Sequence, residues 1–185
     1  MIAAGGGCPG WRPTRALAVS PHRGELLDAL RWVAPFYPEL SGMTIRVGIL
    51  TRGRSLDGVT LPVGREPWIA LRPHPRQPER VRFTAAHELT HLLQWPRGIV
   101  PQGERACDLH ALARVGHYVT WPPRYLRVPP EARASWPRWQ EVAHALAGEA
   151  LRERARGLRM YLSWWEREFL RCMGSRCPRE NAAPR

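Results

Sequence analysis

The hydrophobic and polar residues of this chain first fall into a regular pattern near residue 20. Ser20 and Pro21 are typical of a helix N-cap and of the first helical position. Apolar residues then recur at helical spacing: Leu26, Leu27, Leu30 and Val33. Residues 1–19, in contrast, are rich in Gly, Pro and Arg and have no apolar period. We therefore expect a flexible leader over 1–19 and a helix that begins beside Ser20.

Three short segments after this helix have the pattern of β-strands. Residues 43–50 alternate apolar and polar side chains, which is typical of a half-buried strand. Residues 59–63 and 67–72 are two further short apolar runs. Pro62 has no N–H to donate to a strand ladder, which indicates an edge or an irregular strand for 59–63. The pattern therefore predicts a small three-stranded sheet.

Helical patterns fill most of the second half of the chain. We expect one helix from Pro78 to about Gln94 and another over roughly 102–116. A Pro-rich segment follows, "WPPRYLRVPP", which is rigid and non-helical. The helical period returns from 132 to 172 and can divide at its glycines, Gly148 and Gly157.

The order of these elements predicts an α+β domain with a helical extension. We place the domain at 20–128, the extension at 129–172 and a mobile tail at 173–185. The extension carries a long apolar stripe that includes three tryptophans, so it must pack against the domain or against a second copy. We expect the first arrangement, in a monomer.

Composition narrows the class of protein. The chain has 185 residues, of which 44% are hydrophobic, so it can bury one core and is not disordered as a whole. The formal net charge is +12, and every basic residue is Arg. Such a charge makes a nucleic-acid partner possible. The absence of Lys and the even spread of Arg instead favour a bias toward Arg codons, so nucleic-acid binding is not favoured.

The sequence gives few signs of export or of a membrane. No apolar run approaches the roughly 18–20 residues of a membrane span. The first residues lack the basic start and apolar stretch of a signal peptide. The cysteines do not form a dense framework and are expected to be thiols in a cytoplasmic protein. They are Cys8, Cys107, Cys172 and Cys177.

The segment "HELTH", residues 87–91, carries the clearest chemistry in the chain. Residues four apart lie on one face of a helix, so His87 and His91 can both offer a ring nitrogen to one Zn²⁺. Glu88 falls beside that metal and can take a proton from the water that zinc activates. The helix also carries many apolar residues, which indicates a core helix rather than a solvated one.

A catalytic zinc site needs a third protein ligand. Glu104 lies 13 residues after His91, and Asp108 lies on the same face of the next helix. His110 is six residues after Glu104, on a different face, so those two cannot both point at the metal. We therefore expect Glu104 to bind zinc and Asp108 to accept a hydrogen bond from the far nitrogen of a ligand histidine.

HELTH followed by Glu-x-x-x-Asp, here "ERACD", resembles the gluzincin metallopeptidases, the thermolysin-like class. The element order is similar to that of compact minigluzincins and of SprT-like or ImmA-like zincins, over about residues 20–125. The resemblance implies a zincin-like catalytic domain with one Zn²⁺ per chain. In that class the two motif histidines and the glutamate bind zinc, and the aspartate supports a histidine. The residues at the matching positions are His87, His91, Glu104 and Asp108, with Glu88 as general base.

The family also uses a His or Tyr that steadies the oxyanion, and this residue cannot be matched by motif. We favour Tyr125 because the prolines around it should hold it rigidly near the second helix of the site. The other candidates are His117, Tyr118 and His144.

The sequence therefore predicts a zinc metallopeptidase that cleaves an extended peptide or protein chain. We expect the strand at 67–72 to be the sheet edge along which the substrate adds. The minigluzincin resemblance also implies that the C-terminal extension screens the site. Two alternatives stay open. One is a SprT-like protease acting on DNA-bound proteins or a nucleic-acid-binding protein, and the other is a partner-binding zincin scaffold of a phage or toxin–antitoxin system.

Overall fold

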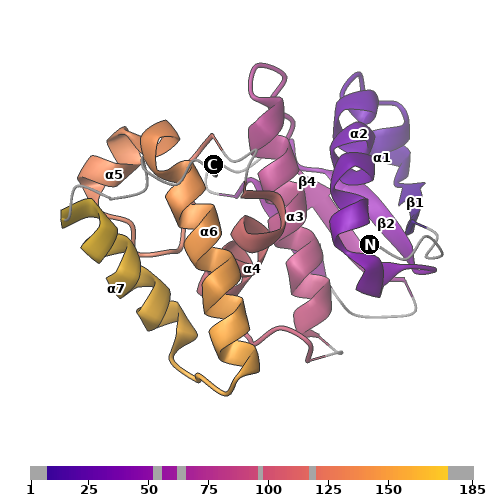
Figure 1. Ribbon diagram of the computed structural model, residues 1–185. Helices are drawn as coiled ribbons and strands as arrows, with labels where there is room; N and C mark the ends of the chain where they lie inside the picture. The colour runs from indigo at the N-terminus through magenta and orange to yellow at the C-terminus, as the bar shows by residue number, and fades with distance from the viewer. Residues whose placement is uncertain (1–7, 52–55, 62–65, 96–97, 117–119, 175–185) are drawn as a thin grey trace, which may run out of the picture.

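The computed structural model describes residues 8–51, 56–61, 66–95, 98–116 and 120–174. In this part of the chain, seven α-helices and a small mixed sheet make an α+β fold, which confirms the expected class. Figure 1 shows helix α3 near the middle of the molecule, with the sheet and the N-terminal helices on one side and α6 and α7 on the other. The tail from residue 175 and Pro62 lie outside the described residues.

The sheet has four strands in the order β1-β2-β4-β3. They are β1 (Gly10–Pro13), β2 (Thr44–Ile49), β3 (Gly58–Leu61) and β4 (Trp68–Leu71). Strands β1, β2 and β4 are parallel, and β3 pairs antiparallel with β4. The prediction of three strands is wrong because β1 forms inside the expected leader. Its four residues are too few to show an alternating pattern, and it is held by pairing with β2.

The expected substrate edge at 67–72 is also wrong. Strand β4 pairs with β2 on one side and with β3 on the other, so β3 forms the edge of the sheet. The burial of the residues in β3 and β4 agrees with this strand order. The residues of β4 from Ile69 to Leu71 are fully buried, as in a central strand, whereas no residue of β3 is fully buried.

Two short helices cover the sheet region: α1 (Arg15–Ala18) and α2 (Arg23–Val33). Helix α2 begins at Arg23, two residues later than expected, and the Ser20 hydroxyl accepts from the backbone N–H of His22 in the turn before the helix. Helix α3 spans Pro78–Gln94, as predicted, and α4 spans Glu104–Val115. Helix α3 packs against α2, α4, β3 and β4 and so forms the centre of the core.

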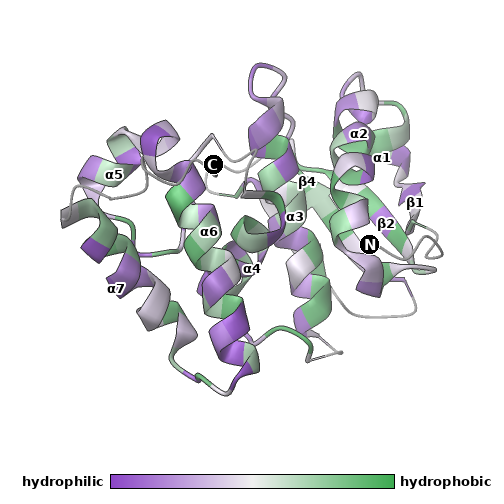
Figure 2. Cartoon of the chain, in the orientation of Figure 1, coloured by the Kyte–Doolittle hydropathy of each residue, from purple (hydrophilic) through white to green (hydrophobic). Residues whose placement is uncertain are grey.

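The C-terminal helices pack onto the rest of the chain. They are α5 (Pro130–Ala134), α6 (Trp136–Ala155) and α7 (Tyr161–Gly174), and α6 packs on α4. The break lies at Gly157, whose positive φ of 106° suits glycine, and Gly148 stays inside α6. Figure 2 shows alternating hydrophobic and hydrophilic turns along α6 and α7, which is typical of helices that bury one face.

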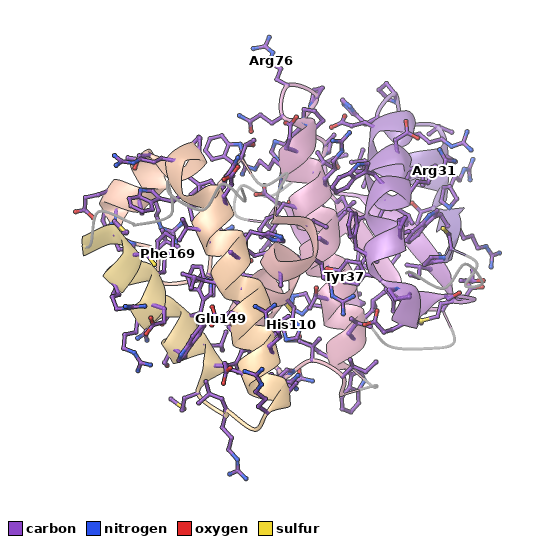
Figure 3. All side chains as sticks on the ribbon, in the orientation of Figure 1. Arg31, Tyr37, Arg76, His110, Glu149 and Phe169 are labelled. Atoms are coloured by element: carbon purple, nitrogen blue, oxygen red, sulfur yellow. The ribbon has the colours of Figure 1, made fainter. Side chains whose placement is uncertain are left out.

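Aromatic side chains fix the extension to the core. Trp136, Trp165 and Phe169 are fully buried, and the rings of Trp165 and Phe169 stack with centroids 5.1 Å apart. Figure 3 shows Phe169 between α7 and α6. The Trp165 indole N–H donates to the carbonyl of Ala143 over 3.1 Å. The extension is therefore part of the hydrophobic core rather than a separate cover.

We predict that Trp165→Ala destabilises the protein by about 3–5 kcal/mol, because it leaves a large cavity between α6 and α7. Urea unfolding followed by fluorescence or circular dichroism measures the loss. The control is Trp95→Ala, since Trp95 is 57% exposed and should contribute little to the free energy of unfolding. Equal losses for the two variants would contradict a shared core.

Candidate functional site

The HELTH motif lies in the middle of α3, with His87 and Glu88 buried and His91 half-buried. Pro78 occupies the first turn, where its missing N–H costs nothing. The helix continues without interruption to Gln94, so His87 and His91 lie one turn apart on the same face. Their rings approach edge to face, with centroids 4.9 Å apart.

Three side-chain atoms from α3 and α4 converge on one point. The Nε2 atoms of His87 and His91 lie 3.2 Å apart. Oε2 of Glu104 lies 2.9 Å from the first and 3.4 Å from the second. Tetrahedral coordination with bonds of about 2.0–2.2 Å separates neighbouring ligand atoms by roughly 3.3 Å. The structure thus brings the three expected ligands to spacings that suit one metal ion.

The outer nitrogens of both histidines have acceptors. Nδ1 of His87 lies 2.8 Å from Oδ1 of Asp108, and Nδ1 of His91 lies 2.8 Å from Oε1 of Gln94. A proton on each Nδ1 leaves the lone pair of each Nε2 directed at the shared point. Asp108 therefore occupies the place that the sequence predicts. Gln94 was not predicted, although its position three residues after His91 on the same helix is a signal that could have found it.

Cys107 offers a second donor set. Ligand atoms of His87, His91 and Cys107 all lie within 4.8 Å of one another, so this buried group could hold a metal ion. Its Sγ, however, lies 3.3 Å from Nδ1 of His91, the nitrogen that Gln94 also contacts. Burial and the nearby carboxylates raise the pKa of the Cys107 thiol. The set with Glu104 fits better, because it uses the two nitrogens that face each other.

A proton takes the place of a cation when no metal is bound. Burial lowers the pKa of His87, but hydrogen bonds to Asp108 and Glu104 outweigh it and raise the pKa to about 10. The hydrogen bond from His87 in turn lowers the pKa of Glu104. His87 therefore lies as a buried imidazolium between two carboxylates, an environment that favours positive charge.

Glu88 is held by the edge strand β3. The Thr60 hydroxyl donates to Oε2 of Glu88 over 2.6 Å. A Cβ atom on Gly58 would come within 2.4 Å of Oε1, so a larger residue there would displace this carboxylate. Burial raises the pKa of Glu88, and the charge of His87 opposes the increase. Neither Gly58 nor Thr60 was predicted, since contacts between a strand and a helix 28 residues later leave no local signal.

Tyr125 lies at the site, whereas His144 makes its contact elsewhere. The Tyr125 ring stacks on that of His87 with centroids 5.6 Å apart, and its backbone N–H donates to Oδ2 of Asp108 over 2.5 Å. Burial and the charge of Glu104 raise the pKa of the Tyr125 phenol, which keeps it protonated. His144 instead contacts the Leu112 carbonyl through Nδ1. His117 and Tyr118 lie outside the described residues.

Two hollows flank the convergent atoms. The first has a volume of about 360 Å³ and lies beside His87 and Asp108, between the start of β3 and the segment 121–125. The second, of about 260 Å³, lies beside His91 and Glu104 along the rest of β3. Gly58 and Tyr125 line both. Together they form a cleft that follows the edge strand past the site.

His110 lies away from the site, as its spacing from Glu104 predicts. It is buried on α4 with its ring edge to face with Tyr161, at 6.2 Å between centroids. Figure 3 shows it inside the molecule beside α6. Burial and the positive charges of Arg114 and Arg154 lower its pKa to about 3. The residue is therefore a neutral part of the core.

Comparison with known proteins adds no identification. No family model, curated protein or solved structure matches the chain. Among the described residues, no helix is long and apolar enough to cross a lipid bilayer. What the site does must therefore be argued from its geometry and chemistry.

We predict that one metal ion binds per chain through His87, His91 and Glu104. Elemental analysis after loading with Zn²⁺ should show most of the metal lost in His91→Ala and strongly reduced in Glu104→Ala. Cys107→Ser should keep about one ion per chain, because the thiol contacts the outer nitrogen of His91. Loss of metal in Cys107→Ser with retention in Glu104→Ala would assign the metal to the thiol set instead.

We also predict that His110 lowers the free energy of unfolding at acidic pH. Its folded pKa of about 3 lies below its ordinary value, so the unfolded chain binds a proton first as the pH falls. Titration of His110 therefore does not lower the free energy of unfolding above about pH 6.5. Below that pH it lowers it by up to about 1.4 kcal/mol per pH unit. Urea unfolding of the metal-free protein at pH 7.5 and 5 should show a smaller pH effect in His110→Leu. Identical pH effects would show that His110 titrates normally.

Proposed function

We propose that the protein is a zinc-dependent peptidase of the gluzincin type, with a compact zincin-like fold, that hydrolyses peptide bonds in an extended chain. One observation carries this proposal. Two Nε2 atoms and one carboxylate oxygen converge at 2.9–3.4 Å, and a buried glutamate lies next in sequence to one of them. A structural zinc site would close the coordination with a fourth side chain, whereas this set leaves room for water and substrate.

The donor set suits zinc. Two imidazoles and one carboxylate form the ligand set of a known class of catalytic zinc sites. When bound, Zn²⁺ supplies a Lewis acid that lowers the pKa of a water and polarises a carbonyl. Asp108 and Gln94 fix the ring orientation of the two histidines, so that both nitrogens are presented before any ion arrives.

Glu88 has the properties of the general base. Burial raises its pKa, which makes the carboxylate a stronger base that can accept a proton from water and return it to a leaving amine. The Thr60 hydroxyl and the bare backbone of Gly58 fix the carboxylate beside His87 and His91. The base therefore needs no rearrangement to act.

Tyr125 is suited to stabilise the oxyanion. Its phenol stays protonated and can donate a hydrogen bond as negative charge develops on the carbonyl oxygen. The same Asp108 carboxylate that orients His87 holds the Tyr125 backbone, which couples the tyrosine to the metal ligands.

The edge strand β3 is suited to bind the substrate backbone. Among the described strands it pairs only with β4, so its outer edge can form main-chain hydrogen bonds with an extended peptide. Several large apolar side chains near this edge are 46–57% exposed. A group of such exposed apolar side chains is typical of a surface that binds another molecule. These side chains belong to Leu56, Trp95 and Trp121, which line the two hollows, and Leu61 at the end of β3.

We predict that Glu88→Gln keeps its zinc and loses proteolysis. Glutamine preserves the shape and can still bond to Thr60, but it cannot accept the proton. Cleavage of a fluorescent casein by zinc-loaded protein should fall by about a hundredfold to ten-thousandfold, which is the range that a general base typically contributes.

The matched control is Glu141→Gln, an exposed glutamate on α6 that should leave both metal and activity unchanged. Full proteolysis by Glu88→Gln at normal zinc content would refute the role of Glu88. Absence of cleavage by the zinc-loaded wild-type chain, across several unfolded protein substrates, would refute the peptidase itself.

A further inference from the structure

The hollow beside His87 has apolar walls and a basic rim. Phe83, Trp121 and Pro122 line it, and its volume of about 360 Å³ is enough for one large side chain. Three arginines line it as well: Arg80, Arg124 and Arg133. Of its two acidic residues, Asp108 accepts from His87 and Tyr125.

The arginines differ in the groups that their guanidinium groups contact. Arg80 forms an ion pair with Asp57, the other acidic residue of the hollow, at 2.7 Å. Arg133 donates to the carbonyls of Leu126 and Val128 over 2.8 and 3.1 Å. No carboxylate of the described residues forms a salt bridge with it. The guanidinium of Arg133 is thus held in place by neutral acceptors, which leaves its charge available to an anion.

The second hollow has the opposite character. Its only acidic or basic lining residues are His91 and Glu104, both of which belong to the convergent group. The rest are neutral, among them Thr60, Gln102 and Trp95. The cleft is therefore basic at one end and neutral at the other, so a substrate lying along it meets two different environments.

The direction of β3 relates these two ends to a substrate. Asp57, just before the strand, lines only the basic hollow, and Thr60, within the strand, lines only the neutral one. The strand therefore runs from the basic hollow toward the neutral one. A peptide added antiparallel to β3 runs the other way. It therefore places the residue after the scissile bond in the basic hollow and the residue before it in the neutral hollow.

We propose that the basic hollow binds a carboxylate on the residue that follows the scissile bond, with Arg124 and Arg133 as its partners. This inference rests on the proposed peptidase function and names its substrate class: chains with an acidic residue at that position. The carboxylate is that of an Asp or Glu side chain or of a chain terminus. The apolar residues of the hollow would contact the methylene groups of a glutamate side chain. This favours glutamate over aspartate, whose side chain is shorter.

The first experiment measures binding without turnover. Zinc-loaded Glu88→Gln protein is titrated into fluorescein-labelled, C-terminally amidated hexapeptides of alanine and leucine that carry one Glu, Gln or Lys. We expect the Glu peptide to bind about tenfold more tightly than the Gln peptide, which is the contribution of one charge-assisted pair. Adding Arg124→Gln should reduce that ratio to about threefold or less, and Arg124→Glu should favour the Lys peptide.

The matched control is Arg127→Gln, which removes the same charge from the same segment outside the hollow and should keep the preference. A Gln peptide with a free C-terminus separates the two carboxylate sources, because tight binding of that peptide alone would assign the hollow to a chain terminus. Equal binding of Glu and Gln peptides, or an equal effect of Arg127→Gln and Arg124→Gln, would overturn the proposal.

The second experiment measures turnover by the wild-type chain. A pool of amidated peptides is digested, and the residue that follows each cut is identified by mass spectrometry. Enrichment of Glu and Asp after the cut supports the proposal, and their enrichment before the cut overturns the assigned strand direction. Cleavage without acidic preference refutes the carboxylate site alone. A Glu preference in binding with no cleavage at all refutes the peptidase while leaving the anion site in place.

Discussion

Helix α3 is a core helix that carries polar side chains into the interior, and the rest of the structure is arranged to satisfy them. A buried polar or charged group costs several kcal/mol when it has no partner. Several of these groups on α3 receive partners from other elements, and His91 is paired with Gln94 on α3 itself. Asp108 on α4 meets His87, and Thr60 on β3 meets Glu88. Tyr37, between α2 and β2, donates to the carbonyl of Ala86 over 2.6 Å.

The same requirement gives the C-terminal extension a structural part in the site. Glu166 on α7 accepts from the backbone N–H of Arg127 over 3.1 Å and pairs with Arg105 on α4 at 2.6 Å. These contacts fix the segment that carries Tyr125 against the helix that carries Glu104 and Asp108. Neither α6 nor α7 lines the cleft in the described part of the chain. Helices α6 and α7 thus support the site without lining it, whereas Arg133 of α5 lines one hollow, and the expected screening of the zinc finds no support in α6 and α7.

The sequence predicts the parts of this site that depend on local spacing. The i,i+4 pair of His87 and His91 needs only an unbroken helix, and α3 has the predicted bounds. Glu104 and Asp108 follow in the same way from one face of α4. The sequence does not predict Thr60, Gly58 or the edge position of β3, because these depend on which strands pair. Strand β1 was missed for the same reason, since its conformation comes from pairing with β2 rather than from its own four residues.

The most direct test of the account is X-ray absorption at the zinc edge of the loaded wild-type protein. It separates Zn–N and Zn–O bonds of about 2.0–2.1 Å from Zn–S bonds of about 2.3 Å. With His87, His91 and Glu104 as ligands, the spectrum should fit nitrogen and oxygen neighbours alone, including the outer-ring signature of two imidazoles. A sulfur neighbour at about 2.3 Å would place Cys107 on the metal and contradict the open, catalytic arrangement from which the proposed function is argued.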